Sequence, residues 1–210
     1  DNTLYESTTG ALSNGMGAFL FVAQNNQSEV RRALLAFDLA GNLPAGATIL
    51  SARLTLNMSR TVTGAQIVTL HRVLSDWGEG ASDAPGEEGG GIAAATGDAT
   101  WIHTFFNTQR WTNAGGDFAA QASATQSVTG LGSYTWGSTP EMIADVQSWL
   151  NTPASNFGWI MASNEIASQS AKRFDSRQNP TAGNRPALTV TYMVSAGIEE
   201  RDGASPIKFE

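Results

Sequence analysis

The residues best suited to chemistry are six carboxylates in a glycine-rich stretch near the middle of the 210-residue chain. Ca²⁺ takes about six to eight oxygen ligands, and carboxylates on flexible loops often supply them. Asp76, Glu79 and Asp83 are the candidate ligands of a structural Ca²⁺. The spacing is not that of an EF-hand loop, so a solvated acidic loop is the alternative. The other carboxylates of the stretch are Glu87, Glu88 and Asp98.

Aromatic residues crowd the same third of the chain, and large rigid rings can stack on sugars or fill a core. Trp101, Trp111 and Trp136 are the candidates for binding an extracellular polysaccharide. Aromatic side chains dominate core energetics, which favours burial of these rings under the long loop. Trp149 and Trp159 fit core positions of a helix and a strand, so we assign them to no site.

Catalytic patterns are missing from the sequence. His71 and His103 are the only histidines, and neither has a Cys or a second His at metal-ligand spacing. The chain contains no G-x-S-x-G elbow and no H-E-x-x-H helix. Acids are plentiful, but nothing selects a pair for glycoside hydrolysis. We therefore expect a protein that is not an enzyme and has no catalytic residues.

The last residues, 195–210, form a polar segment that ends in an alternating pattern. Pro206, Ile207, Lys208 and Phe209 alternate apolar and polar character, which is typical of a short strand with one face to bury. Strand addition to a sheet edge can join domains, and head-to-tail contacts grow filaments. Ile207 and Phe209 are thus the candidate assembly residues. Folding of the tail onto its own domain is the alternative.

Alternating or β-branched segments bounded by Gly, Pro or Asn predict the strands that must position these residues. The clearest segment is 52–58, where Ala52, Leu54, Leu56 and Met58 alternate with polar residues. That pattern is typical of an antiparallel sheet with one buried and one solvated face. The predicted strands cover residues 3–7, 18–23, 31–38, 48–59, 66–73, 126–128, 157–162, 172–175 and 188–194.

One helix is predicted after residue 138, because Ser138 and Thr139 offer a cap and Pro140 suits the first turn. Apolar residues then follow helical spacing to Leu150, and Pro153 lies beyond the end. The segment 75–125 is rich in glycine and lacks a period, which predicts a long functional or metal-tied loop.

The composition excludes several classes of partner. The net charge is −7, and the chain has only two lysines, so a nucleic-acid partner is not expected. No apolar run approaches the roughly 18 residues that cross a bilayer, so we expect no membrane insertion. There are no cysteines, which excludes disulfides and thiol chemistry. The start at Asp1, without a leader, is interpreted as a mature chain whose signal peptide has been removed.

An ordered series of short motifs resembles the DNRLRE domain family over about residues 1–194. The motifs are DNTLYE at 1–6, RALLAFDL at 32–39, LPAGATI at 43–49, SARLTL at 51–56, DWGE at 76–79, NFGW at 156–159, FDSR at 174–177 and RPALTVTY at 185–192. The first motif departs from the family name at Thr3 and Tyr5. The resemblance implies a secreted jelly-roll-like sandwich found in microbial surface proteins, with some relatives similar to alginate-binding modules.

These observations predict an all-β, antiparallel jelly-roll-like β-sandwich over residues 1–194, with one short helix and a long glycine-rich loop, followed by a tail at 195–210. We expect an extracellular or cell-surface structural protein, assembled from copies of itself into a filament through terminal strands. The alternative is a polysaccharide-binding module.

Overall fold

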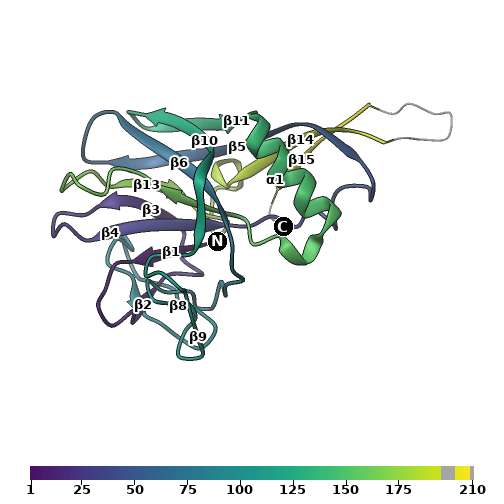
Figure 1. Ribbon diagram of the computed structural model, residues 1–210. Helices are drawn as coiled ribbons and strands as arrows, with labels where there is room; N and C mark the ends of the chain where they lie inside the picture. Colours follow the sequence, from purple (N-terminus) through teal and green to yellow (C-terminus); the bar gives the residue numbers. More distant parts are fainter. Residues whose placement is uncertain (195–201, 209–210) are drawn as a thin grey trace.

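The computed structural model describes residues 1–194 and 202–208. Its main feature is an 11-stranded antiparallel sheet that curls over itself to form a sandwich-like body (Figure 1). The predicted all-β sandwich class with one helix and a long glycine-rich loop is confirmed. Within the described residues, no helix is long and apolar enough to cross a lipid bilayer.

The order of strands along the sheet sets which residues become neighbours. The path runs β10 (Phe118–Val128), β6 (Gln66–Val73), β12 (Trp159–Ala162), β4 (Val30–Leu35), β3 (Phe19–Gln24), β13 (Lys172–Asp175), β5 (Thr48–Thr61), β14 (Ala187–Met193) and β15 (Asp202–Lys208). Off this path, β1 (Asn2–Tyr5) pairs with β4, and β11 (Gly132–Gly137) pairs with β5. Strands far apart in sequence, such as β3 and β13, therefore lie side by side.

The longest strand, β5, keeps the sheet continuous because it pairs with three other strands. Ala52, Leu54, Leu56 and Met58 are all fully buried, as their alternation predicts. β5 pairs with β14 from Thr48 to Thr55 and with β13 from Met58 to Thr61. One strand thus serves two successive partners, and β11 also pairs with it.

Strands β4 and β12 are buried on both faces because the long loop covers the outside of the sheet. Ala33 and Leu35 of β4 belong to the central core, whereas Val30 and Leu34 belong to a second cluster. Successive side chains of a strand point to opposite faces, so this division follows from the pleat. The second cluster includes Trp101, which comes from the segment between β6 and β10.

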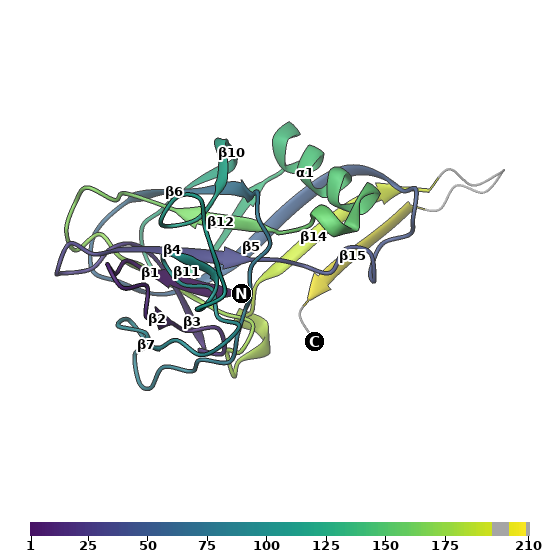
Figure 2. The same cartoon turned by 60° about the horizontal axis from the view of Figure 1, so that its bottom comes forward.

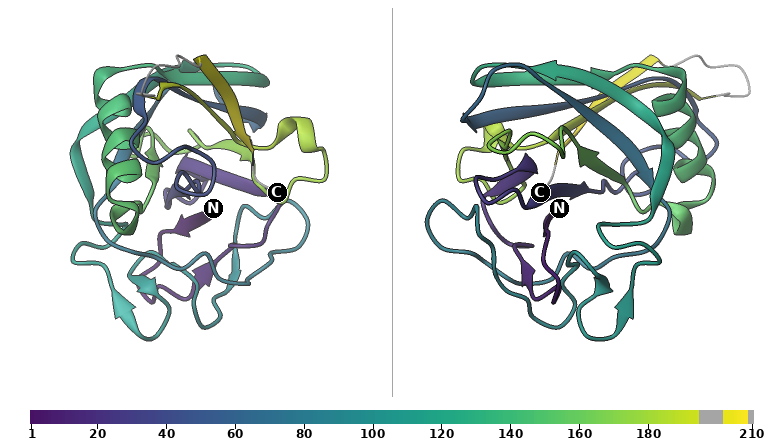
Figure 3. Two further views of the ribbon diagram at one scale, coloured as in Figure 1. Left: turned by 90° about the vertical axis from the view of Figure 1, so that its right-hand side faces the viewer. Right: turned by 60° about the vertical axis from the view of Figure 1, so that its left-hand side comes forward.

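That long segment forms one small two-stranded sheet by itself and a second one with Leu12–Ser13 near the N-terminus, as viewed from other sides in Figures 2 and 3. β2 (Leu12–Ser13) pairs with β7 (Ile92–Ala93), and β8 (His103–Phe105) pairs with β9 (Gln109–Arg110). Most of the segment is irregular, as its glycine content predicts. Carboxylates fix its turns: Asp98, for example, accepts hydrogen bonds from the main-chain nitrogens of Ala81 and Ala95.

The helix α1 (Pro140–Asn151) follows the predicted signals. The Thr139 hydroxyl accepts a hydrogen bond from the Met142 nitrogen, and Pro140 occupies the first turn. Two short 3₁₀ turns, η1 (Pro153–Ser155) and η2 (Ala182–Asn184), connect later elements. Trp149 of α1 packs edge-on against Trp159 of β12, with ring centroids 4.6 Å apart, and so seals the core beneath the helix.

The tail strand β15 belongs to the main sheet of its own chain. β15 pairs with β14 of the same chain over seven residues at the edge of the sheet (Figure 2). Ile207 lies opposite Leu188 in this register, and Phe209 lies outside the described residues. The arrangement matches the alternative in which the tail folds back on its own domain.

Candidate functional site: a cationic groove

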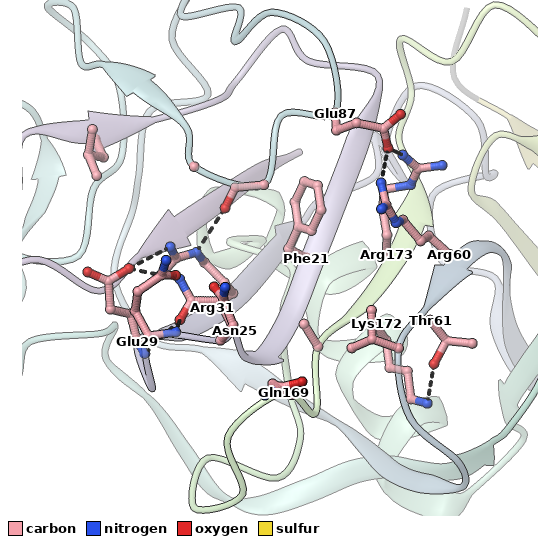
Figure 4. A pocket seen from close by; sticks show the side chains of 17 residues that line it. Phe21, Asn25, Glu29, Arg31, Arg60, Thr61, Glu87, Gln169, Lys172 and Arg173 are labelled. Carbon is pink, nitrogen blue, oxygen red and sulfur yellow. Dashed lines mark hydrogen bonds and ion pairs between the residues drawn. The ribbon is translucent and has the colours of Figure 1, made fainter.

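A groove of about 800 Å³ opens on the molecule where β3, β5 and β13 meet two loops (Figure 4). Residues 25–29 connect β3 to β4 on one side, and residues 86–91 of the long loop form the other side. Phe21 of β3 lies between a group around Arg31 and a group around Arg173 in this view. The groove is therefore assembled from segments that are distant in sequence.

The lining of the groove is positive, although the chain as a whole is acidic. Four basic residues line it against two acidic ones, Glu29 and Glu87, so its formal charge is +2 in a chain of −7. The basic residues are Arg31, Arg60, Lys172 and Arg173. Clefts lined by one sign of charge raise the local concentration of ligands of opposite charge. The groove thus favours an anionic ligand.

Arg60 and Arg173 form the most charged part of the groove. They are directly opposite each other across the antiparallel pair of β5 and β13. Nη1 of Arg173 donates to Oε2 of Glu87 over 2.6 Å, and Nη1 of Arg60 donates to the same oxygen. The guanidinium of Arg173 also lies 3.7 Å above the ring centroid of Phe19, which holds it in place. A single carboxylate oxygen therefore bridges two guanidiniums.

Arg31 forms the second cationic group. Its side chain is almost fully buried, lies 4.9 Å from the ring centroid of Tyr5, and donates to Glu29 over 3.0 Å. It also donates to the carbonyl oxygens of Val30 and Gly89, at 3.0 and 3.4 Å. These contacts fix Arg31 as a wall of the groove and tie the loop at residue 89 to β4.

Lys172 is buried and makes three hydrogen bonds through Nζ. The acceptors are the Thr61 hydroxyl at 2.6 Å, the Thr63 carbonyl at 2.8 Å and the Gly64 carbonyl at 2.6 Å. All three ammonium protons can thereby be satisfied. Burial lowers the pKa of Lys172, because desolvation disfavours its charged form. We interpret Lys172 as a structural anchor of the hairpin beside the groove.

Four amide side chains line the groove, at Asn25, Asn26, Gln27 and Gln169. Amides donate and accept hydrogen bonds, as sugar hydroxyls require. Ser28 has a φ of 62° and Gln169 a φ of 59°, both in the left-handed region. Strained backbone of this kind concentrates at functional sites.

Glu88 holds the loop that carries Glu87. Its buried carboxylate accepts hydrogen bonds from the main-chain nitrogens of Ala18 and Phe19, each at 3.0 Å, and from Asn14 Nδ2 at 2.8 Å. Glu88 itself has a φ of 60°. The loop backbone is therefore anchored next to Glu87, whose own side chain is 70 % exposed.

Of the three candidate calcium ligands, Asp76 and Glu79 line the same pocket and Asp83 does not. Asp76 and Glu79 line a smaller pocket of about 240 Å³ with Arg177, whereas Asp83 is exposed and is not part of its lining. Nη2 of Arg177 donates to Glu79 over 2.5 Å, so this carboxylate already faces a cation. Within residues 1–194 and 202–208, no group of three or more His, Cys, Asp or Glu side chains could hold a metal ion.

Calcium binding by Asp76, Glu79 and Asp83 stays a prediction. A calcium titration followed by melting temperature tests it, and a melting temperature that a chelator leaves unchanged would reject it.

The three tryptophans proposed as sugar platforms are buried. Trp136 is fully buried and packs edge-on against Phe174, and its Nε1 donates to the Val68 carbonyl at 2.9 Å. Trp111 is 5 % exposed and Trp101 9 % exposed. The guanidinium of Arg32 lies 5.0 Å from the Trp101 ring centroid. Burial leaves little ring surface for stacking on a sugar, and sugar binding by Trp101, Trp111 and Trp136 stays a prediction.

The histidines make local contacts. His71 Nδ1 lies 2.9 Å from the Ala119 carbonyl, and His103 Nδ1 lies 3.0 Å from the Thr100 hydroxyl. Burial lowers the pKa of His103; nearby Arg110 acts in the same direction, and a main-chain hydrogen bond with Gly10 opposes it. These partners explain the position of each imidazole without an added ligand.

Sequence reasoning missed the groove. Arg60 and Glu87 were not recognised as partners, because only the register of β5 and β13 and the path of the loop bring them together. One signal was available. Lys172 and Arg173 are adjacent basic residues in a chain with only 12 basic residues. This pair indicates local positive charge on a predicted strand of an acidic chain, although Lys172 itself anchors the neighbouring hairpin.

Comparison with protein-family models, curated proteins and solved structures found no match. The resemblance to the DNRLRE domain family therefore stays a prediction, and the function must be argued from the groove.

Proposed function

We propose that this protein is a non-catalytic extracellular module that binds an acidic polysaccharide in the cationic groove. The observation that carries the proposal is the Arg60–Arg173 pair, held directly opposite each other in a groove of net positive lining. Arginine guanidiniums bind carboxylates through two parallel hydrogen bonds, which a planar fork of donors makes possible.

A polysaccharide fits the rest of the lining. The amides of Asn26, Gln27 and Gln169 suit hydroxyl groups, and Phe21 adds an apolar surface between the charged groups. An acidic sugar polymer presents carboxylates and hydroxyls in alternation. The extracellular location rests on the composition, which is poor in charge and rich in uncharged polar residues.

Calorimetric titration with sodium polygalacturonate tests this function, with dextran as the neutral control and poly-glutamate as an acidic control without sugar rings. We expect saturable binding of polygalacturonate that weakens as salt rises, because charges more than roughly 10 Å apart are screened at about 0.1 M salt. Binding of poly-glutamate alone would reject a sugar ligand, and equal binding of dextran would reject the role of charge.

A second candidate function is assembly into filaments through β15. The supporting observation is that β15 is the terminal strand at the edge of the sheet and pairs with β14 over seven residues. The same pairing made with a neighbouring copy would join subunits head to tail. A variant ending at Val194 should then give only monomers in electron micrographs, whereas polymers from this variant would reject the idea.

A further inference from the structure

Glu87 occupies an unusual position between two cations. Like charges directly opposite each other on antiparallel strands are destabilising, and Arg60 and Arg173 are such a pair. Glu87 approaches from a loop that is not part of either strand and places one oxygen against both guanidiniums. The two strands therefore create a place for an anion, and the loop fills it.

The bridging contact is exposed, whereas its framework is fixed. The side chain of Glu87 is 70 % exposed and that of Arg60 is 55 % exposed, but that of Arg173 is only 13 % exposed. Arg173 is held by the Phe19 ring and by a hydrogen bond from its Nε to the Ser59 hydroxyl at 3.2 Å. Withdrawal of Glu87 would thus leave a preorganised guanidinium.

Withdrawal of Glu87 requires little else to move. The neighbouring Glu88 anchors the main chain through hydrogen bonds from Ala18 and Phe19. A change of side-chain rotamer at Glu87 is therefore enough to open the space between the arginines. Exposed ion pairs contribute little net stability, so an incoming carboxylate can compete with this one.

We propose that the Arg60–Arg173 pair is the subsite for one carboxylate of the acidic polysaccharide, and that Glu87 fills this subsite until the ligand displaces it. The inference rests on the proposed function and deepens it. It assigns a carboxylate rather than a sulfate ester, because a carboxylate already fits between the two guanidiniums. Hydrogen bonds from both arginines and their charges lower the pKa of Glu87, so the competitor is ionised at neutral pH.

The test compares the binding of sodium polygalacturonate to the full chain and to Glu87→Gln. Removing the internal competitor should raise the affinity by about 1.5-fold to fivefold, the range that exposed ion pairs contribute. Glu141→Gln, an exposed residue of α1, makes the same change in net charge and should leave the affinity unchanged. Adding Arg173→Gln to Glu87→Gln should abolish the gain.

Each other outcome counts against the proposal. An equal gain for Glu87→Gln and Glu141→Gln would show only a general charge effect. Unchanged affinity of Glu87→Gln, with clear binding by the wild-type protein, would reject displacement while the proposed function stands. A gain for dextran sulfate but not for polygalacturonate would reject the carboxylate assignment. Absence of polygalacturonate binding in every variant would reject the proposed function itself, and this inference with it.

Discussion

Arg60 and Arg173 face each other across β5 and β13, and one oxygen of Glu87 accepts hydrogen bonds from both. The arrangement places two cations at the surface of a chain whose net charge is −7, and Arg173 is the one held by further contacts. The register of β5 and β13 shifts between Arg173 and Phe174, and irregular pairing of this kind often re-aims side chains next to functional sites. Substitution of this pair should therefore change ligand binding, whereas substitution of residues that support the fold should change stability.

Arg173→Lys should weaken polygalacturonate binding although the charge is kept. A lysine ammonium cannot make the planar two-bond contact with a carboxylate, and it would lose the guanidinium stacking on Phe19. We expect a loss of about tenfold in affinity by calorimetry, typical of one charge-assisted hydrogen bond. Full affinity in this variant would show that Arg173 acts only as a point charge.

Trp136→Phe should destabilise the fold and leave ligand affinity intact. The indole is fully buried and donates to the Val68 carbonyl, which would lose its donor in the variant. A cavity and an unsatisfied buried acceptor together cost about 2–4 kcal/mol. Urea denaturation measures this loss. A variant of unchanged stability but reduced polysaccharide affinity would instead support a sugar-binding role for Trp136.

Stability should fall as pH decreases below 6.5, partly through His103. Burial lowers its folded-state pKa below the ordinary value of 6.5. In the window between the two values the unfolded chain binds more protons, so acidification favours unfolding. We expect His103→Gln to show a shallower decline of melting temperature across this window. A decline as steep as that of the wild-type protein would contradict the assignment.

Asp117 should contribute to stability by fixing the turn before β10. Burial acts to raise the pKa of Asp117, but hydrogen bonds from Thr112 and Asn113 outweigh it and leave the pKa lowered. The contribution of Asp117 to the free energy of unfolding is present above the unfolded-state pKa, and it is lost as the pH falls through the folded-state pKa. Asp117→Asn should cost about 1–2 kcal/mol at neutral pH by urea denaturation. A neutral effect would show that solvent replaces these hydrogen bonds.

The regular part of the fold could be predicted because its signals are local. The alternation of 52–58 predicted the buried face of β5, and Thr139 and Pro140 predicted the start of α1. β10 was predicted only at its end, residues 126–128, because alanines dominate its first half and have little preference for strands. β11 was missed because its alternation spans only the four residues between its terminal glycines.

The groove could not be predicted, because no single stretch of sequence contains it. Arg31, Arg60 and Arg173 come from β4, β5 and β13, and only strand order and register place them around one space. Two other carboxylates of the glycine-rich stretch illustrate the same limit. Glu88 and Asp98 hold loop backbone through main-chain hydrogen bonds, a role that depends on folding rather than on spacing.

The most direct test of the cationic groove is calorimetric titration of polygalacturonate into the wild-type protein and into Arg60→Gln/Arg173→Gln. A matched control, Arg53→Gln/Arg110→Gln, removes two exposed arginines outside the groove and gives the same net charge. We predict saturable binding for the wild-type protein and the control, and at least a roughly tenfold loss for the groove variant. Equal affinity for all three proteins would contradict a polysaccharide site at Arg60 and Arg173.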